Sequence, residues 1–180
     1  MQLSQKAAAE MTQDLQSVDG SDEPVVSGRA RAEADAAARG VSIRITERPA
    51  ARSLEEAAAL LGLEPSGIVK TLVVKRSDGT FLFALVPGGR KISWPKLRAL
   101  VGVNKLQLPD AAVALEATGF ERGTITPFGS TNAWPVYADA TIVGHEIAMG
   151  AGAHGYSLFV DADALIASFD AVVADITDPE

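Results

Sequence analysis

The sequence predicts an α+β fold in which a mixed, partly barrel-like β-sheet is flanked by helices. Strand-like runs occur early and late in residues 41–176, and several helical segments with end signals lie between them. No regular alternation of strand and helix is present, which argues against a doubly wound parallel sheet. With 180 residues, 47% of them hydrophobic, the chain is long enough for one domain with a substantial core.

The chain is expected to divide into two parts. Residues 17–28 read SVDGSDEPVVSG, a turn-rich and acidic run. We therefore expect residues 1–27 to form a peripheral, flexible segment and residues 28–180 to form the folded domain.

The first elements of the domain have clear end signals. Residues 29–39 are rich in alanine and predict a helix that stops at Gly40, and residues 41–48 alternate like a half-buried strand. Ser53 and Glu56 have the spacing of a capping box, which predicts a helix that stops at Gly62.

A hairpin is expected next. Residues 68–75 are apolar and β-branched apart from a lysine, residues 77–80 read SDGT, and residues 81–87 read FLFALVP. Ser93 then precedes a short helical segment, WPKLRALVG, as an N-cap would.

The last third of the chain predicts mostly short strands. A helix is expected to open near Asp110 and to end at Gly119. After a loop come three strand-like runs, then a helix that begins at Asp161, and then AVVADI as a final strand. The three runs are VYADATIVG, HEIAM and YSLFV.

Composition narrows the classes of function. The chain has no cysteine, which removes disulfides, thiolate nucleophiles and most structural zinc sites. No apolar run approaches the roughly 20 residues of a membrane span, and the N-terminus has no apolar signal region, so we expect a cytoplasmic protein. No serine-hydrolase elbow and no paired carboxylates in an acid–base arrangement are recognisable.

Positive charge is concentrated in one part of an acidic chain. The net charge is −7, but residues 70–122 hold nine Lys and Arg against four Asp and Glu, and residues 123–180 hold eight acids and no base. Such a block can dock a phosphate backbone. It can equally be a solvated face that offsets the acidic remainder.

Lys70 is the first candidate for chemistry. Strand alternation places it on the face of Ile68, Leu72 and Val74, where a buried ammonium is costly unless it is paired. It either reaches past the edge of the strand to water or lines a pocket that faces a carbonyl, carboxylate or phosphate.

Two glycine-rich segments are further candidates. Residues 119–129 read GFERGTITPFG, a stiff loop whose N–H groups could bind a carbonyl or a phosphate, although it could be an ordinary connection. Residues 150–155 read GAGAHG and match G-x-G-x-x-G, but a β-rich run follows instead of a helix, so a dinucleotide site is not supported. His154 in this turn could donate to a ligand. His145 fits a structural role, and two histidines nine residues apart make a poor metal site.

Three segments in this order resemble the YbaK/ProX family: Gly67-Ile68-Val69-Lys70-Thr71-Leu72, then GFERGTITPFG, then GAGAHG. These proteins are trans-editing aminoacyl-tRNA deacylases related to the editing domain of bacterial prolyl-tRNA synthetases. The resemblance covers roughly residues 40–176 and implies a mixed, barrel-like sheet flanked by helices.

The resemblance implies hydrolysis of the ester that joins a mischarged amino acid to the terminal adenosine of a tRNA. The chemistry is largely substrate-assisted, needs no cofactor or metal, and involves neither DNA nor a membrane. The implied partners are aminoacyl-tRNA, in particular tRNA(Pro), and prolyl-tRNA synthetase. Lys70 matches the family lysine, and the other implied substrate-binding residues are Thr71, Gly123, Thr124, Ile125, Thr126, Pro127, Gly152, His154 and Gly155.

The loop departs from one pattern of the family. Many cysteinyl-tRNA(Pro) deacylases have GGxSP, whereas Thr124 and Thr126 stand in the second and fourth positions here, and the TPFG ending is closer to relatives that edit alanine. The resemblance thus leaves Cys and Ala open as the amino acid removed, and Thr124 is expected to narrow the pocket. Two other functions stay open: a non-catalytic module that binds tRNA or a synthetase, and an unrelated small-molecule esterase.

Overall fold

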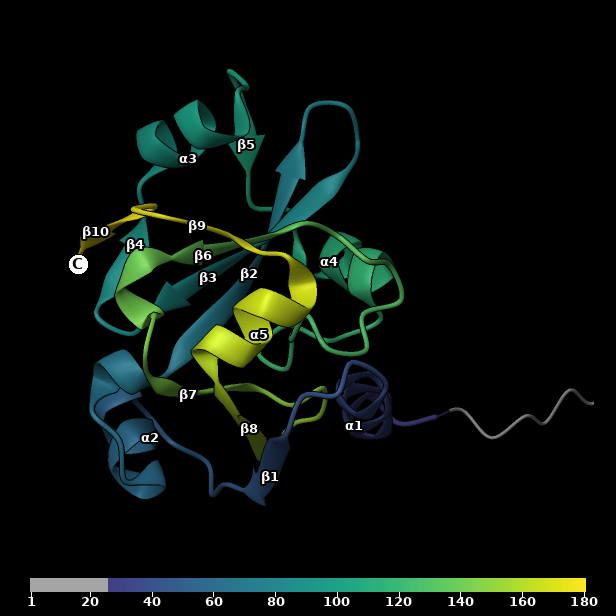
Figure 1. Cartoon of the computed structure of the whole chain (residues 1–180), viewed down its shortest axis with the longest axis vertical. Helices are drawn as coiled ribbons and strands as arrows, with labels where there is room; N and C mark the ends of the chain where they lie inside the picture. Colours follow the sequence, from purple (N-terminus) through teal and green to yellow (C-terminus); the bar gives the residue numbers. More distant parts are fainter. Residues whose placement is uncertain (1–25) are drawn as a thin grey trace, which may run out of the picture.

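The structure is a computed structural model that describes residues 26–180 (Figure 1). The expected peripheral segment 1–27 therefore lies almost entirely outside the described residues. The helices are α1 (Gly28–Ala38), α2 (Leu54–Leu61), α3 (Trp94–Val101), α4 (Ala111–Thr118) and α5 (Ala162–Phe169), with short 3-10 turns η1 (Pro65–Gly67) and η2 (Ala140–Ile142). Within the described residues, no helix is both long and apolar enough to span a membrane.

The strands form three sheets. Strands β5 (Leu106–Gln107), β2 (Val69–Arg76), β3 (Phe81–Pro87), β6 (Val136–Asp139) and β9 (Val172–Ala174) lie in that order in a five-stranded sheet, in which β3, β6 and β9 are parallel. Strands β1 (Ile43–Glu47), β8 (Tyr156–Asp161) and β7 (Glu146–Gly150) form an antiparallel sheet, and β10 (Thr177–Pro179) pairs with β4 (Arg90–Ile92). The sheets are not closed into a barrel, but the expected mixed α+β arrangement is confirmed.

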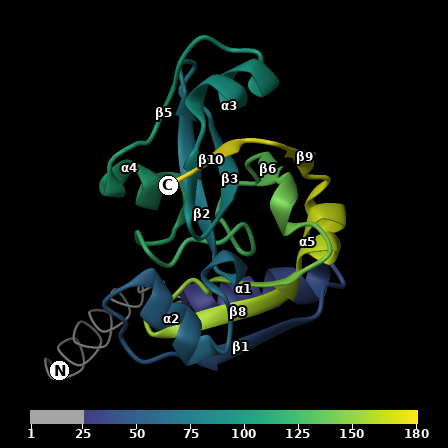
Figure 2. The same cartoon turned by 90° about the vertical axis from the view of Figure 1, so that its left-hand side faces the viewer.

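Strands β2 and β3 separate two hydrophobic cores. Val69 and Val73 point into the larger core, which joins the five-stranded sheet to the three-stranded sheet, α1 and α5. Val74 and Leu72 face the smaller core beneath α3. Figures 1 and 2 both place the three-stranded sheet at one end of the molecule and α3 at the other. Alternate side chains of β2 therefore pack into the two cores, one on each face of the strand, in agreement with the alternation that the sequence predicts.

The loop at residues 119–129 is held inside the fold by α1. The Arg31 guanidinium donates to the carbonyl of Gly119 at 2.7 Å, and the Asp35 carboxylate accepts from the N–H of Gly129 at 2.9 Å. Phe120 and Phe128 are fully buried. Because the side chains of α1 satisfy the polar groups of the loop, a segment without regular structure can cross the core.

The short strands are where the expectations were incomplete. Strands β4, β5 and β10 have three residues or fewer and carry no alternating pattern, so pairing with distant segments defines them. The expected final strand AVVADI is strand β9 only in its first part. At α2, Ser53 caps the helix as expected, but the Glu56 carboxylate accepts from the N–H of Arg52 instead of Ser53.

Candidate functional site

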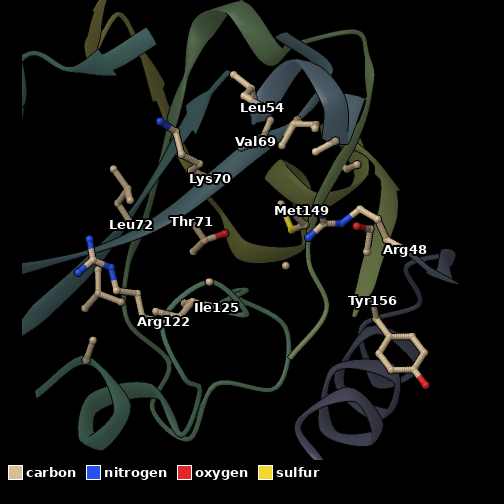
Figure 3. A pocket seen from close by; sticks show the side chains of 18 of the residues that line it. Arg48, Leu54, Val69, Lys70, Thr71, Leu72, Arg122, Ile125, Met149 and Tyr156 are labelled. Atoms are coloured by element: carbon tan, nitrogen blue, oxygen red, sulfur yellow. The ribbon is translucent and has the colours of Figure 1, made fainter. Parts of the chain in front are cut away.

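A cleft of about 490 Å³ opens beside strand β2 and is the candidate site, because it gathers several of the predicted site residues (Figure 3). Its walls come from α2, the outer edge of β2, the start of α4, the 119–129 loop and the ends of β7 and β8. A volume of this size suits a small ligand or the terminal part of a larger one. Of the predicted site residues, Lys70, Thr71, Gly123 and Ile125 line the cleft.

The open edge of β2 explains why neighbouring residues on opposite faces share one cleft. Strand β5 pairs only with Lys75 and Arg76, and Ile68 forms an isolated bridge with Ala148 of β7, so in the described residues no strand pairs with the outer edge of residues 70–73. The cleft therefore meets the backbone edge together with side chains from both faces. In Figure 3 the Thr71 hydroxyl points toward Met149, whereas Lys70 extends away along the rim.

The Thr71 hydroxyl is buried beside the cleft without a partner in the described part of the chain. Thr71 is 8% exposed, and its Oγ1 makes no hydrogen bond within the described residues. A hydroxyl in this position loses contact with water without compensation, which costs free energy. A polar ligand atom in the cleft would remove that cost.

Lys70 lies at the rim of the cleft beside Glu180, the residue after strand β10. Its Nζ lies 3.7 Å from the Glu180 carboxylate, and the Lys70 side chain is 43% exposed. Such an exposed ion pair is weak, so a phosphate or carboxylate could displace Glu180. Lys70 is thus a rim cation that also lines the cleft.

Lys96 and Asp139 fix the C-terminal segment that carries Glu180. Lys96 contacts Asp175 and Asp178, each at 2.9 Å, and hydrogen bonds to Asp178 and Asp175 raise the pKa of Lys96. Asp139 is buried and accepts from the N–H of Ile176 and the hydroxyl of Thr177. Asp139 is therefore a structural anchor for this segment.

We expect Asp139→Asn to lower stability in a pH-dependent way. Burial raises the pKa of Asp139, but hydrogen bonds from Thr141, Thr177 and Ile176 outweigh it and hold the pKa below 3.8. The carboxylate therefore contributes stability that is present above the unfolded-state pKa and is lost as pH falls through the lower folded-state pKa. Urea unfolding should show a loss of about 1–3 kcal/mol at pH 7 that narrows below about pH 4. Glu116→Gln, at an exposed position, should show no such loss.

The threonines of the 119–129 loop do not line the cleft. Thr124 is 3% exposed and its hydroxyl donates to the carbonyl of Glu121 at 2.7 Å, while the Thr126 hydroxyl contacts Met149 Sδ at 3.4 Å. Pro127 lines a separate cleft beside α1. The expectation that Thr124 narrows the pocket with its own side chain thus does not match its position. Both threonines instead fix the backbone that presents Gly123 and Ile125.

The turn at residues 150–155 packs behind this loop. The N–H of Gly152 donates to the carbonyl of Thr124 at 2.8 Å, and a Cβ on Gly150 would lie 2.5 Å from the Ile125 carbonyl oxygen. The exposed His154 ring lies 2.7 Å from the Glu121 carboxylate, outside the cleft. Gly150 lines the cleft, but Gly152, His154 and Gly155 do not. The turn supports the loop that forms one wall.

The cleft is lined by cations without carboxylates. Arg48, Lys70 and Arg122 line it, and no Asp, Glu or His is among its described lining residues. Arg48 lies outside the basic block and was not among the residues predicted from the sequence. Its position directly after an alternating strand was the available signal. The arrangement can attract an anion but offers no side chain that acts as a general base at neutral pH.

Four cations of the basic block divide between two places in the fold. Arg90 donates to the Thr177 hydroxyl at 2.6 Å, and Lys96 binds two aspartates, so both fasten the C-terminal segment. Lys70 and Arg122 lie at the cleft. Among residues 26–180, no group of three or more His, Asp or Glu side chains is arranged to hold a metal ion.

Comparisons with known proteins point to one family. Residues 48–167 match the aminoacyl-tRNA editing domain. A proposed trans-editing enzyme for prolyl-tRNA synthetase has a similar structure, with a TM-score of 0.77 and 29% identity over 84% of this chain and 97% of that one. The proline–tRNA ligase of Thermosipho africanus is 40% identical over 82 residues, 46% of this chain. The ligase of Desulfovibrio desulfuricans is 40% identical over 96 residues, 53% of this chain.

The similarity to the ligases is confined to a small part of them. The matched segments make up 14% and 16% of those two proteins. All of the residues that line the cleft, from Arg48 to Ser157, lie within the 48–167 match.

Proposed function

Because the chain belongs to the aminoacyl-tRNA editing domain family, we propose that it hydrolyses mischarged aminoacyl-tRNA in trans. The proposed substrate is tRNA(Pro) that carries a small non-cognate amino acid such as Cys or Ala. The observation that carries the proposal is the position of the whole cleft inside the matched residues 48–167. The similarity to the editing regions of proline–tRNA ligases supports tRNA(Pro) and suggests action beside a prolyl-tRNA synthetase, in the cytoplasm.

The residues of the cleft suggest their roles. Lys70 would hold the tRNA end through a phosphate or carbonyl, and the unpaired Thr71 hydroxyl would bond to the substrate. Loop N–H groups at Gly123 and Ile125 would stabilise the oxyanion that forms when water attacks the ester carbonyl. Thr124, Thr126 and Pro127 would hold that loop in place, with Gly152, His154 and Gly155 supporting it from behind.

The proton transfers are proposed to involve the substrate itself. No described residue that lines the cleft has a carboxylate or an imidazole, so water activation by a protein base lacks a candidate. The terminal adenosine carries a free hydroxyl next to the ester, and this group can order the attacking water. Collapse of the tetrahedral intermediate would release the free amino acid and leave the ribose oxygen protonated.

We expect Thr71→Val to reduce activity without reducing stability. The Thr71 hydroxyl has no partner among residues 26–180, so replacing it by a methyl group should leave the free energy of unfolding unchanged or slightly higher. Loss of a substrate hydrogen bond should lower kcat/KM about 10-fold. Single-turnover deacylation and urea unfolding measure the two effects. Thr71→Ser keeps the hydroxyl and should retain activity, and equal losses in both variants would argue against this role.

A panel of tRNA(Pro) charged with Cys, Ala or Ser tests the substrate. The proposal requires turnover of at least one of them by the purified chain. A non-catalytic module remains the second candidate, because the described lining of the cleft has three cations and no base. It would show salt-dependent tRNA binding without release of the amino acid.

A further inference from the structure

Arg48 is positioned by the three-stranded sheet to reach the cleft. Its N–H donates to the carbonyl of Gly155 at 2.8 Å, one residue beyond the end of β1. Thr46 pairs with Ser157 in the register of β1 and β8, so Arg48, two residues on, lies on the same face as Ser157. Figure 3 shows the guanidinium directed toward Met149, across the cleft from Lys70.

Arg48 is half-buried, and its guanidinium has no partner among the described residues. Its side chain makes no hydrogen bond or ion pair there, although other arginines of this part of the fold do. Arg39 pairs with Asp35 at 3.0 Å, and Arg44 lies 3.6 Å from Glu146. A partly desolvated cation without an anion is unfavourable. The site therefore fits a ligand that brings the negative charge.

The chemistry of the cleft favours a phosphate as that ligand. Guanidinium binds phosphate oxygens in a bidentate manner, and the buried Ser157 also lines this part of the cleft. A small amino acid such as Cys or Ala has no side-chain carboxylate. Every tRNA, however, carries a phosphodiester one nucleoside away from the ester.

We propose that Arg48 binds the phosphodiester that joins the terminal adenosine to the rest of the tRNA. This inference rests on the proposed function and adds to it a second phosphate contact, opposite Lys70. Arg48 then places the terminal nucleoside between two walls of the cleft. The contribution of Arg48 to substrate binding should depend on the phosphate and not on the amino acid.

The test compares substrates with and without that phosphate. Arg48→Ala should lower kcat/KM on aminoacyl-tRNA(Pro) roughly 10- to 100-fold, mainly through KM. On an aminoacyl ester of free adenosine, which lacks the phosphate, Arg48→Ala should lower kcat/KM by less than about 2-fold. The control is Arg44→Ala, which removes the same charge from the same face of β1 outside the cleft and should change neither value.

Three outcomes would overturn the proposal. Arg48→Ala could lower kcat/KM equally on both substrates, or on neither. It could also lower kcat/KM only on tRNA charged with Asp or Glu. The last would assign Arg48 to a side-chain carboxylate.

A binding measurement separates this inference from the proposed function. The RNA trinucleotide CCA carries the phosphodiester but no ester, so its affinity can be measured by fluorescence anisotropy without turnover. Arg48→Ala should weaken CCA binding roughly 10-fold or more, and a neutral methylphosphonate at the last linkage should remove the difference from wild type. If the wild-type chain hydrolyses no aminoacyl-tRNA, the proposed function fails while this comparison still decides the role of Arg48. If CCA binds equally to both proteins, the role of Arg48 fails.

Discussion

Lys70→Ala should lower kcat/KM for a mischarged tRNA(Pro) by about 100-fold or more, the loss typical of removing one charge-stabilising donor. The effect of Lys70→Ala on the free energy of unfolding should be small. Lys70 is half-exposed and its one described ion pair, to Glu180, is weak, so the free energy of unfolding should change by no more than about 0.5 kcal/mol. Single-turnover hydrolysis and urea unfolding, measured on the same preparation, give the two numbers.

Two further variants define what Lys70 contributes. Lys75→Ala removes the same charge from the same strand outside the cleft. Its kcat/KM should stay within about 2-fold of the wild-type value. Lys70→Arg keeps the charge in a different shape and should recover part of the activity if charge on phosphate is the main effect. A Lys70→Ala variant with unchanged kcat/KM would remove Lys70 from the mechanism.

Gly152→Ala should destabilise the fold much more than Gly155→Ala. Both glycines have a left-handed backbone, with φ of +81° and +80°. A Cβ on Gly152 would lie 2.5 Å from the Gly28 carbonyl oxygen, whereas a Cβ on Gly155 meets nothing within 4 Å. Backbone strain alone should cost about 1–2 kcal/mol in either variant. The close approach to α1 should add about 1–3 kcal/mol in Gly152→Ala only.

The activity of the Gly152 variant tests whether the turn supports the site. Because the N–H of Gly152 bonds to Thr124, a shifted turn should also shift the loop and lower kcat at a temperature where the protein is still folded. Gly155→Ala should keep nearly full activity. If the two variants have the same unfolding free energy, the contact with Gly28 does not matter for stability.

The helices were predictable because their ends are encoded locally. Ser53, Asp110 and Asp161 each accept a hydrogen bond from the first turn that follows, and Gly62 and Gly119 adopt the left-handed conformation after their helices. These signals depend on a few adjacent residues. They therefore appear in the sequence before any tertiary contact is known.

The parts that sequence did not predict depend on distant contacts. Strand β10 exists because it pairs with β4, and Arg48 reaches the cleft because β1 pairs with β8. The burial of Thr124 and Thr126 results from packing against β7 and from the hydrogen bonds between α1 and the loop. The motif around residues 123–127 therefore indicated the correct loop. It did not indicate which side of the loop faces the cleft.

Amino-acid release from Ala- or Cys-tRNA(Pro) by the purified chain alone, compared with release from Pro-tRNA(Pro), is the decisive measurement of the proposed deacylase activity. The proposed activity requires that at least one mischarged tRNA loses its amino acid well above the spontaneous rate, that Pro-tRNA(Pro) is spared, and that Lys70→Ala removes the difference. Salt-dependent binding of every tRNA with no release above the spontaneous rate would contradict it. That result would make the cleft a tRNA-binding site without catalysis.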